Sequence, residues 1–149
     1  MNPLGILIAG LIGTLAMSVA MAVEPRMGLP QFDAIGWLSA AITARPIRVV
    51  GFILHLIVGV LWMLVYAAVW SAGITAPGVS LGIVAGIIHW LIAGVLVGVV
   101  VPLFAGVQSG AIKAPGMYMR ELGSMGFIAG LMPHIIYGMT VGLVYQFFV

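Results

Sequence analysis

Two histidines, His55 and His134, stand in the same sequence pattern. Each has a glycine four residues before it, a glycine four residues after it and a tyrosine eleven residues after it. The two copies are Gly51, His55, Gly59, Tyr66 and Gly130, His134, Gly138, Tyr145. A helix turns by about 100° per residue, so the later positions of each copy fall within roughly 80° of its first glycine. Each copy therefore predicts one stripe along a helix.

These histidines, together with His89, lie inside long apolar runs, where an ionisable group is costly and often functional. A neutral imidazole can ligate haem iron. Each histidine also has a small residue four places earlier, which would leave room for a flat macrocycle. These small residues are Gly51, Ala85 and Gly130. We therefore expect a cofactor site for haem or a chlorophyll-type tetrapyrrole, with His55 and His134 as the symmetric pair of ligands.

Three other interpretations of the histidines stay open. Each imidazole could bond to a neighbouring helix, with the small residues serving only helix packing. The histidines could form a path for protons or ions. They could also bind a metal together, although the three acidic residues that might support such a site are expected near the membrane surface. These residues are Glu24, Asp33 and Glu121.

The composition indicates which environment surrounds the chain. Of 149 residues, 64% are hydrophobic and only 5% are charged, against about 25% charged residues in a soluble domain. So much apolar surface requires lipid. A net charge of +2 gives no footprint for nucleic acid, and the absence of cysteine excludes disulfides and cysteine catalysis. No serine or acidic residue forms a nucleophile–base set with the histidines, so no enzyme is expected.

Four apolar runs are long enough to cross a bilayer at 1.5 Å per residue. They predict an all-α fold, an integral membrane four-helix bundle forming one domain over residues 1–149. A short interfacial helix anchored by Trp37 is expected in the first long loop. The predicted spans are 4–23, 47–70, 79–102 and 123–148, and the interfacial loops are 24–46 and 103–122.

Small residues repeat every four positions in two of the spans, which is typical of close helix contacts in membranes. Gly5, Ala9 and Gly13 form one such face, and Gly82 and Gly86 form another. We expect both faces to lie at helix–helix contacts rather than toward lipid.

The basic residues predict the orientation. Every lysine and arginine lies in or beside the loops after the first and third spans, so both long loops should be cytoplasmic and both termini outside. An outer aromatic belt is then expected from six residues: Trp62, Tyr66, Trp70, Tyr145, Phe147 and Phe148.

The histidine pattern belongs to a longer internal repeat. A helix, a long basic loop and a histidine-bearing helix occur twice along the chain. An even number of spans per unit gives both copies the same orientation, so we expect a parallel tandem repeat of two-helix units, related by a two-fold axis along the membrane normal. His55 would then superpose on His134.

Three sets of residues also carry a family resemblance: His55 with Gly59 and Tyr66, Ala85-Gly86 before His89, and His134 with Gly138. Together with four spans and a long first loop, they resemble the YagU-like group of small bacterial inner-membrane proteins. The resemblance implies a four-helix fold in the bacterial cytoplasmic membrane. It differs at Met132-Pro133, where that group tends to have an acidic residue and a glycine.

With so little mass outside the membrane, the sequence favours a non-enzymatic accessory or anchor subunit of a larger membrane complex, with a candidate tetrapyrrole site. Its expected partners are the lipid bilayer and other membrane subunits or further copies of itself. The alternative is a small transporter or a proton- or ion-conducting protein. A transporter needs polar groups along its path, and beyond the histidines only Thr14, Ser18 and Thr140 are available.

Overall fold

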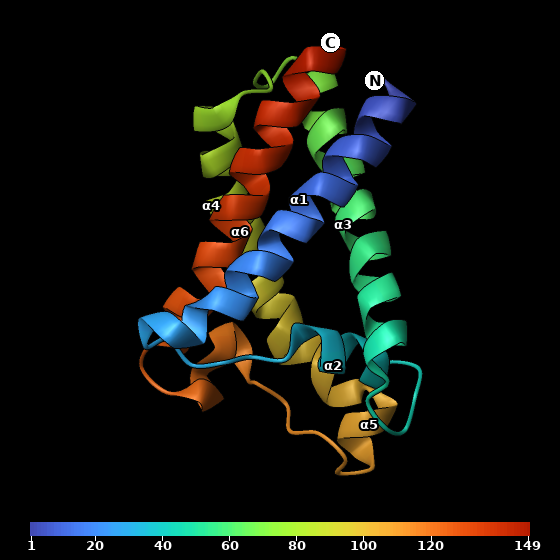
Figure 1. The fold of residues 1–149 in the computed structure, drawn as a ribbon, viewed down its shortest axis with the longest axis vertical. Helices are drawn as coiled ribbons and strands as arrows, with labels where there is room; N and C mark the ends of the chain where they lie inside the picture. Colours follow the sequence, from blue (N-terminus) through green and yellow to red (C-terminus); the bar gives the residue numbers. More distant parts are fainter. The chain divides into compact units, whose positions relative to one another are not determined.

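The four expected spans are four long helices. The computed structural model describes residues 1–149, all-helical and without strands. The long helices are α1 (Pro3–Val23), α3 (Arg48–Ser71), α4 (Val79–Val100) and α6 (Gly126–Tyr145) (Figure 1). All four are long and apolar enough to cross a membrane, counting the short 3-10 turns that extend three of them. The expected spans coincide with these helices to within three residues at each end.

The short elements lie in the two expected loops and at the end of the chain. They are η1 (Glu24–Met27), α2 (Ala34–Ala40), η2 (Val101–Leu103), α5 (Ala105–Gln108), η3 (Met117–Leu122) and η4 (Gln146–Phe148). The short helix expected in the first loop is α2. Its Trp37, expected to anchor in the interface, is instead buried and stacks on Phe32, with ring centroids 5.9 Å apart.

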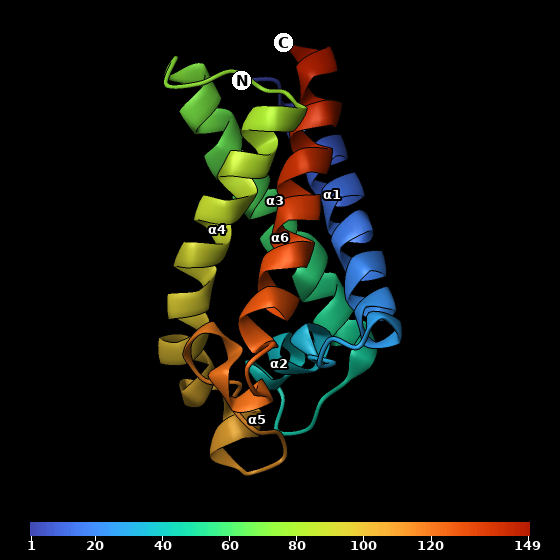
Figure 2. The same cartoon turned by 90° about the vertical axis from the view of Figure 1, so that its left-hand side faces the viewer.

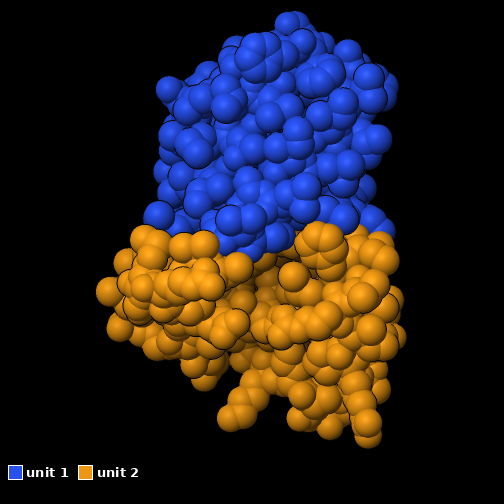
Figure 3. Space-filling model, viewed as in Figure 1, with its two compact units in different colours: residues 1–20, 56–90, 131–149 blue, residues 21–55, 91–130 orange.

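The chain forms two compact units, coloured separately in Figure 3. Unit 1 consists of residues 1–20, 56–90 and 131–149, and unit 2 of residues 21–55 and 91–130. The division falls within each long helix, so each unit holds a segment of all four.

In unit 1, α1 packs against both α3 and α6 through its small residues. A side-chain carbon at Gly10 would meet the Cα of Val60, 2.9 Å away. At Gly13 it would meet Val141, 2.5 Å away. Ala9 is completely buried. A side-chain carbon at Gly5 would meet Phe148 at 2.7 Å and Tyr145 at 3.1 Å. The expectation that the face formed by Gly5, Ala9 and Gly13 lies at helix contacts is therefore confirmed.

The contact between α4 and α6 in unit 1 is made largely by backbone. These helices lie side by side in both cartoon views (Figures 1 and 2). A side-chain carbon on Gly82 would strike the carbonyl oxygen of Gly138, and one on Gly86 would strike that of His134. One on Gly138 would come within 2.8 Å of the Cα of Gly86. The second predicted small-residue face is thus also a helix contact.

The expected aromatic belt is wrong for three of its members. Tyr66, Trp70 and Tyr145 are buried within unit 1 rather than turned toward lipid. Trp70 stacks on Tyr145 with centroids 5.6 Å apart, and the Tyr145 hydroxyl accepts a hydrogen bond from the backbone N–H of Asn2 at 3.0 Å. Because the hydroxyls of Tyr66 and Tyr145 lie beside partners inside the unit, these two side chains do not need the membrane interface.

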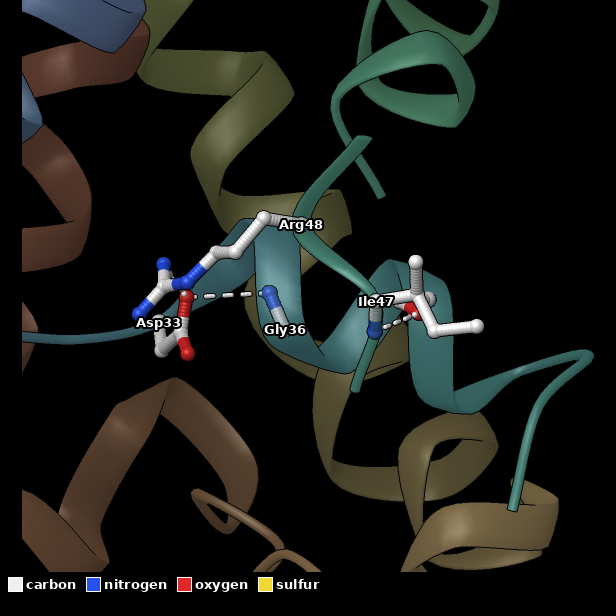
Figure 4. A network of polar contacts seen from close by, with 5 residues as sticks. Asp33, Gly36, Ile47 and Arg48 are labelled. Atoms are coloured by element: carbon white, nitrogen blue, oxygen red, sulfur yellow. Dashed lines mark hydrogen bonds and ion pairs between the residues drawn. The ribbon is translucent and has the colours of Figure 1, made fainter. Parts of the chain in front are cut away.

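In unit 2, polar contacts tie α2 to the start of α3. Asp33 caps α2, since its carboxylate accepts from the N–H of Gly36 at 2.9 Å, and it also pairs with Arg48 at 2.7 Å (Figure 4). The backbone N–H of Ile47 donates to the hydroxyl of Ser39 at 2.7 Å. These contacts fix where the first loop returns to α3.

Replacing Asp33 with alanine should destabilise this region. The helix cap contributes about 1 kcal/mol and the exposed ion pair less than about 1 kcal/mol. We expect faster amide hydrogen exchange in α2, measured by mass spectrometry. Asp33→Asn is the matched control, because asparagine keeps the cap and loses only the charge. Equal exchange in the two variants would contradict a capping role.

The second loop of unit 2 closes against α4 and α6 through glycines. The ring of Tyr118 covers Gly94, and the backbone of Met119 covers Gly126. Tyr118 and Met119 both have left-handed backbone angles, with φ of 51° and 59°. Such angles are unfavourable for residues with side chains. The hydroxyl of Tyr118 donates to the carbonyl of Leu91 at 3.0 Å, which helps to hold this conformation.

Candidate functional site

Two of the three histidines meet inside unit 1. The rings of His89 on α4 and His134 on α6 have centroids 4.7 Å apart and stand nearly perpendicular, at 88°. Their residues are only 5% and 7% exposed. His55, on α3, is also buried but belongs to unit 2. The histidine that meets His134 in unit 1 is His89, whereas the sequence pattern paired His134 with His55.

His89 is enclosed by aromatic rings. Trp62 lies against it with centroids 3.8 Å apart, while Tyr66 and Tyr137 approach with their edges at 6.0 and 5.6 Å. The Tyr66 hydroxyl lies 3.4 Å from Nδ1 of His89, at the long end of hydrogen bonding. We call Tyr66, His89, His134 and Tyr137 the imidazole–tyrosine cluster.

The local sequence explains how these side chains come together. Tyr137 follows His134 by three residues, so both occupy one side of α6. The close approach of α4 and α6 at Gly86 brings His89, three residues later, beside them. On the other side, the Tyr137 hydroxyl donates to the carbonyl oxygen of Gly59 on α3. The cluster thus connects three helices of unit 1.

The glycines of the sequence pattern serve these contacts. Gly59 leaves room for the side chain of Thr14, whose hydroxyl bonds back to the carbonyl of Gly10 at 2.7 Å. Gly138 is the place where α6 meets the backbone of α4. The glycines four residues after His55 and His134, Gly59 and Gly138, therefore serve close packing between helices.

The small residues before the histidines have different surroundings. Gly51 is covered by the backbone carbonyl of Ile35 from α2, so protein fills the space where a macrocycle would lie beside it. Gly130 is buried in unit 2, and Ala85 is half-buried in unit 1. Trp62 already occupies a place against the His89 ring. These contacts favour the packing interpretation over the tetrapyrrole interpretation.

An absorption spectrum tests the tetrapyrrole directly. Close packing around Gly51 and His89 leads us to expect no Soret or pigment band in the protein purified from its native membrane. A band that disappears in His55→Ala or His134→Ala would contradict this and restore the cofactor site.

The carboxylates that form ion pairs have partners other than His89. No carboxylate is hydrogen-bonded or ion-paired to His89, and Asp33 and Glu121 pair with Arg48 and Arg120. A charged imidazolium at His89 would be buried without a carboxylate beside it, which is costly. The structure also contains no group of three histidine, cysteine or acidic side chains that could hold a metal ion.

The sequence alone missed several members of this site. Tyr137 and Trp62 were assigned no role beside the histidines, although Tyr137 lies one helical turn from His134. Glu24, expected near the membrane surface, is buried. Its position directly after an apolar helix was the only available signal.

No model of a known protein family matches this chain, nor does any curated protein or solved structure. The resemblance to the YagU-like group therefore stays a prediction. The fold itself defines the class: an all-helical protein with four helices able to span a membrane, which indicates an integral membrane protein.

Proposed function

We propose that this protein is a non-enzymatic accessory or anchor subunit of a larger membrane assembly in the bacterial cytoplasmic membrane. The observation that carries the proposal is that polar side chains of unit 1 contact other helices of the same unit. The Tyr137 hydroxyl of α6 bonds to the carbonyl of Gly59 on α3, and the Tyr66 hydroxyl of α3 lies 3.4 Å from Nδ1 of His89 on α4. Groups engaged in this way hold helices together and are not presented to a substrate.

The cluster is suited to such a structural role. Hydrogen bonds between membrane helices contribute about 0.6 kcal/mol on average, and aromatic pairs about 0.5–1.5 kcal/mol beyond their buried area. His89 and Tyr137 take part in several such contacts at once. A rigid core of this kind would present a fixed outer surface to neighbouring subunits.

That outer surface is apolar on every long helix. On α4 the exposed large residues include Val84, Ile88, Leu91, Val95 and Val99. Lipid tails and the apolar faces of other membrane helices suit such a surface equally well. The proposed partners are therefore the bilayer and further membrane subunits or copies of this chain.

Native electrophoresis after mild solubilisation tests the accessory role. We expect the protein from its own membrane to migrate in a complex much larger than when expressed alone in a foreign host. Photo-crosslinkers at Ile88 or Val95 should join it to a specific neighbour, while one at buried Met63 should not. Identical migration in both settings, without crosslinks, would contradict the proposal.

A proton- or ion-conducting protein is the second candidate, and one observation favours it. Three groups that can carry protons lie next to one another: the Tyr66 hydroxyl is 3.4 Å from Nδ1 of His89, and the rings of His89 and His134 have centroids 4.7 Å apart. The measurement is proton flux into liposomes that contain the purified protein and a pH-sensitive dye. Flux that exceeds that of empty liposomes and is abolished in His89→Gln would favour this candidate. Flux equal to that of empty liposomes would favour the accessory subunit.

The orientation of the termini is a further prediction. All basic residues lie in or beside the two long loops, so we expect both loops in the cytoplasm and both termini outside. Single cysteines at Asn2 and Val149 should react with an impermeant thiol reagent in intact spheroplasts, whereas one at Lys113 should react only after lysis. The opposite pattern would reverse the orientation.

A further inference from the structure

Glu24 is a buried carboxyl without a partner. It is the first residue of η1, directly after α1, and is only 4% exposed. Neither of its side-chain oxygens has a hydrogen-bond partner in the structure. The other two acidic residues differ, because Asp33 pairs with Arg48 at 2.7 Å and Glu121 pairs with Arg120 at 3.3 Å, both at the surface.

The turn after α1 fixes the backbone at this position. Pro25 continues the chain into a 3-10 turn, and Gly28 ends it with a left-handed φ of 84°. The carbonyl of Glu24 accepts from the N–H of Leu29 at 3.2 Å. These features fix the backbone on both sides of the turn, and in this conformation the side chain of Glu24 is buried.

No positive charge compensates this carboxyl. The other charged or titratable side chains of unit 2 either pair with one another, bond elsewhere or are exposed, and none forms a bond or ion pair with Glu24. They are Arg26, Asp33, Arg45, Arg48, His55, Lys113, Tyr118, Arg120 and Glu121. Burying an isolated carboxylate costs far more than burying the neutral acid.

We propose that Glu24 is a proton-binding site, a carboxyl that the fold holds in its neutral acid form. Glu24 belongs to unit 2, whereas the imidazole–tyrosine cluster belongs to unit 1. The proposal does not depend on the proposed accessory role. Two other states would satisfy a buried carboxylate: a bound monovalent cation, or a basic side chain of a neighbouring subunit. Both keep Glu24 ionised and are distinguished from the neutral acid by its reactivity.

The test uses dicyclohexylcarbodiimide, an apolar reagent that requires the protonated acid. The carboxyl proton moves to a carbodiimide nitrogen while the oxygen adds to its central carbon, and acyl transfer to nitrogen then leaves a stable N-acylurea. The full-length protein in native membranes is treated over a range of pH, and the labelled peptide is identified by mass spectrometry. We expect Glu24 to be labelled at neutral pH at least roughly tenfold more than Glu121. We also expect the labelling of Glu24 to fall as the pH rises.

Two variants and one spectroscopic measurement control the test. Glu24→Gln should abolish the label, and Glu121→Gln should leave it unchanged. If Glu24→Gln does not fold, infrared spectroscopy of the wild-type protein still tests the proposal. A neutral carboxyl gives an infrared carbonyl band that disappears on deprotonation. Labelling of Glu24 no greater than that of Glu121, with no such band at neutral pH, would show an ionised, paired carboxylate and overturn the proposal.

Discussion

Replacing Gly138 with leucine is expected to prevent the chain from folding into a single species. A side-chain carbon at this position would strike the carbonyl oxygen of Gly82 and lie within 2.8 Å of the Cα of Gly86. Backbone cannot move aside as a flexible side chain can. We expect a loss of at least about 3 kcal/mol, at or above the upper end for overpacked cores, which is a large part of a typical folding free energy.

Size-exclusion chromatography and thermal unfolding in detergent would measure this effect. Gly138→Ala should be intermediate, with a loss of about 1–3 kcal/mol. Ala68→Leu is the matched control, because Ala68 is an exposed position on α3 and can accept a larger side chain. A Gly138→Leu protein as stable as Ala68→Leu would show that α4 and α6 do not meet at this glycine.

His89→Ala is expected to have the second largest effect. The substitution leaves a cavity among Trp62, Tyr66 and Tyr137 and removes the nitrogen beside the Tyr66 hydroxyl. Cavities from large-to-small substitutions cost about 2–5 kcal/mol, and an unpaired buried hydroxyl costs about 1–3 kcal/mol. We expect a fall in stability of about 3 kcal/mol, measured as the midpoint of thermal unfolding.

Comparison with His89→Phe separates the ring from its nitrogen. Phenylalanine restores most of the volume, so its loss should be limited to the hydroxyl contact, about 1 kcal/mol. If both variants were equally destabilised, the nitrogen would matter more than the packing. If neither variant were destabilised, the His89 ring would not be enclosed by its aromatic neighbours as the structure shows.

Hydropathy and residue size were sufficient to predict the main elements. Long apolar runs locate α1, α3, α4 and α6 because each must satisfy its own backbone hydrogen bonds and be long enough to cross lipid. Small residues spaced by four predicted the faces at Gly13 and Gly86, since only small residues allow helix backbones to approach closely. These are local properties of a single helix.

The composition of the site could not be predicted in the same way. A repeated sequence pattern predicts which face of a helix a histidine occupies. It does not predict which other helix packs against that face. His134 meets His89, which lies outside the repeated pattern, because the glycines of α4 and α6 bring these helices together. The parallel repeat itself is not shown by the structure and stays a prediction. The burial of Glu24 was not predicted for a similar reason, since it depends on the turn that follows α1.

The glycine contact between α4 and α6 has a consequence for the alignment of the two helices along their axes. Gly78, Gly82 and Gly86 recur every four residues, so sliding α4 by about one turn, or roughly 5.4 Å, would present nearly the same smooth surface to α6. The glycines therefore set the separation of these helices but leave their register weakly defined. The ring of His89 is enclosed by Trp62, Tyr137 and His134. It can occupy this position at only one axial alignment of α4 and α6, and it therefore determines their register.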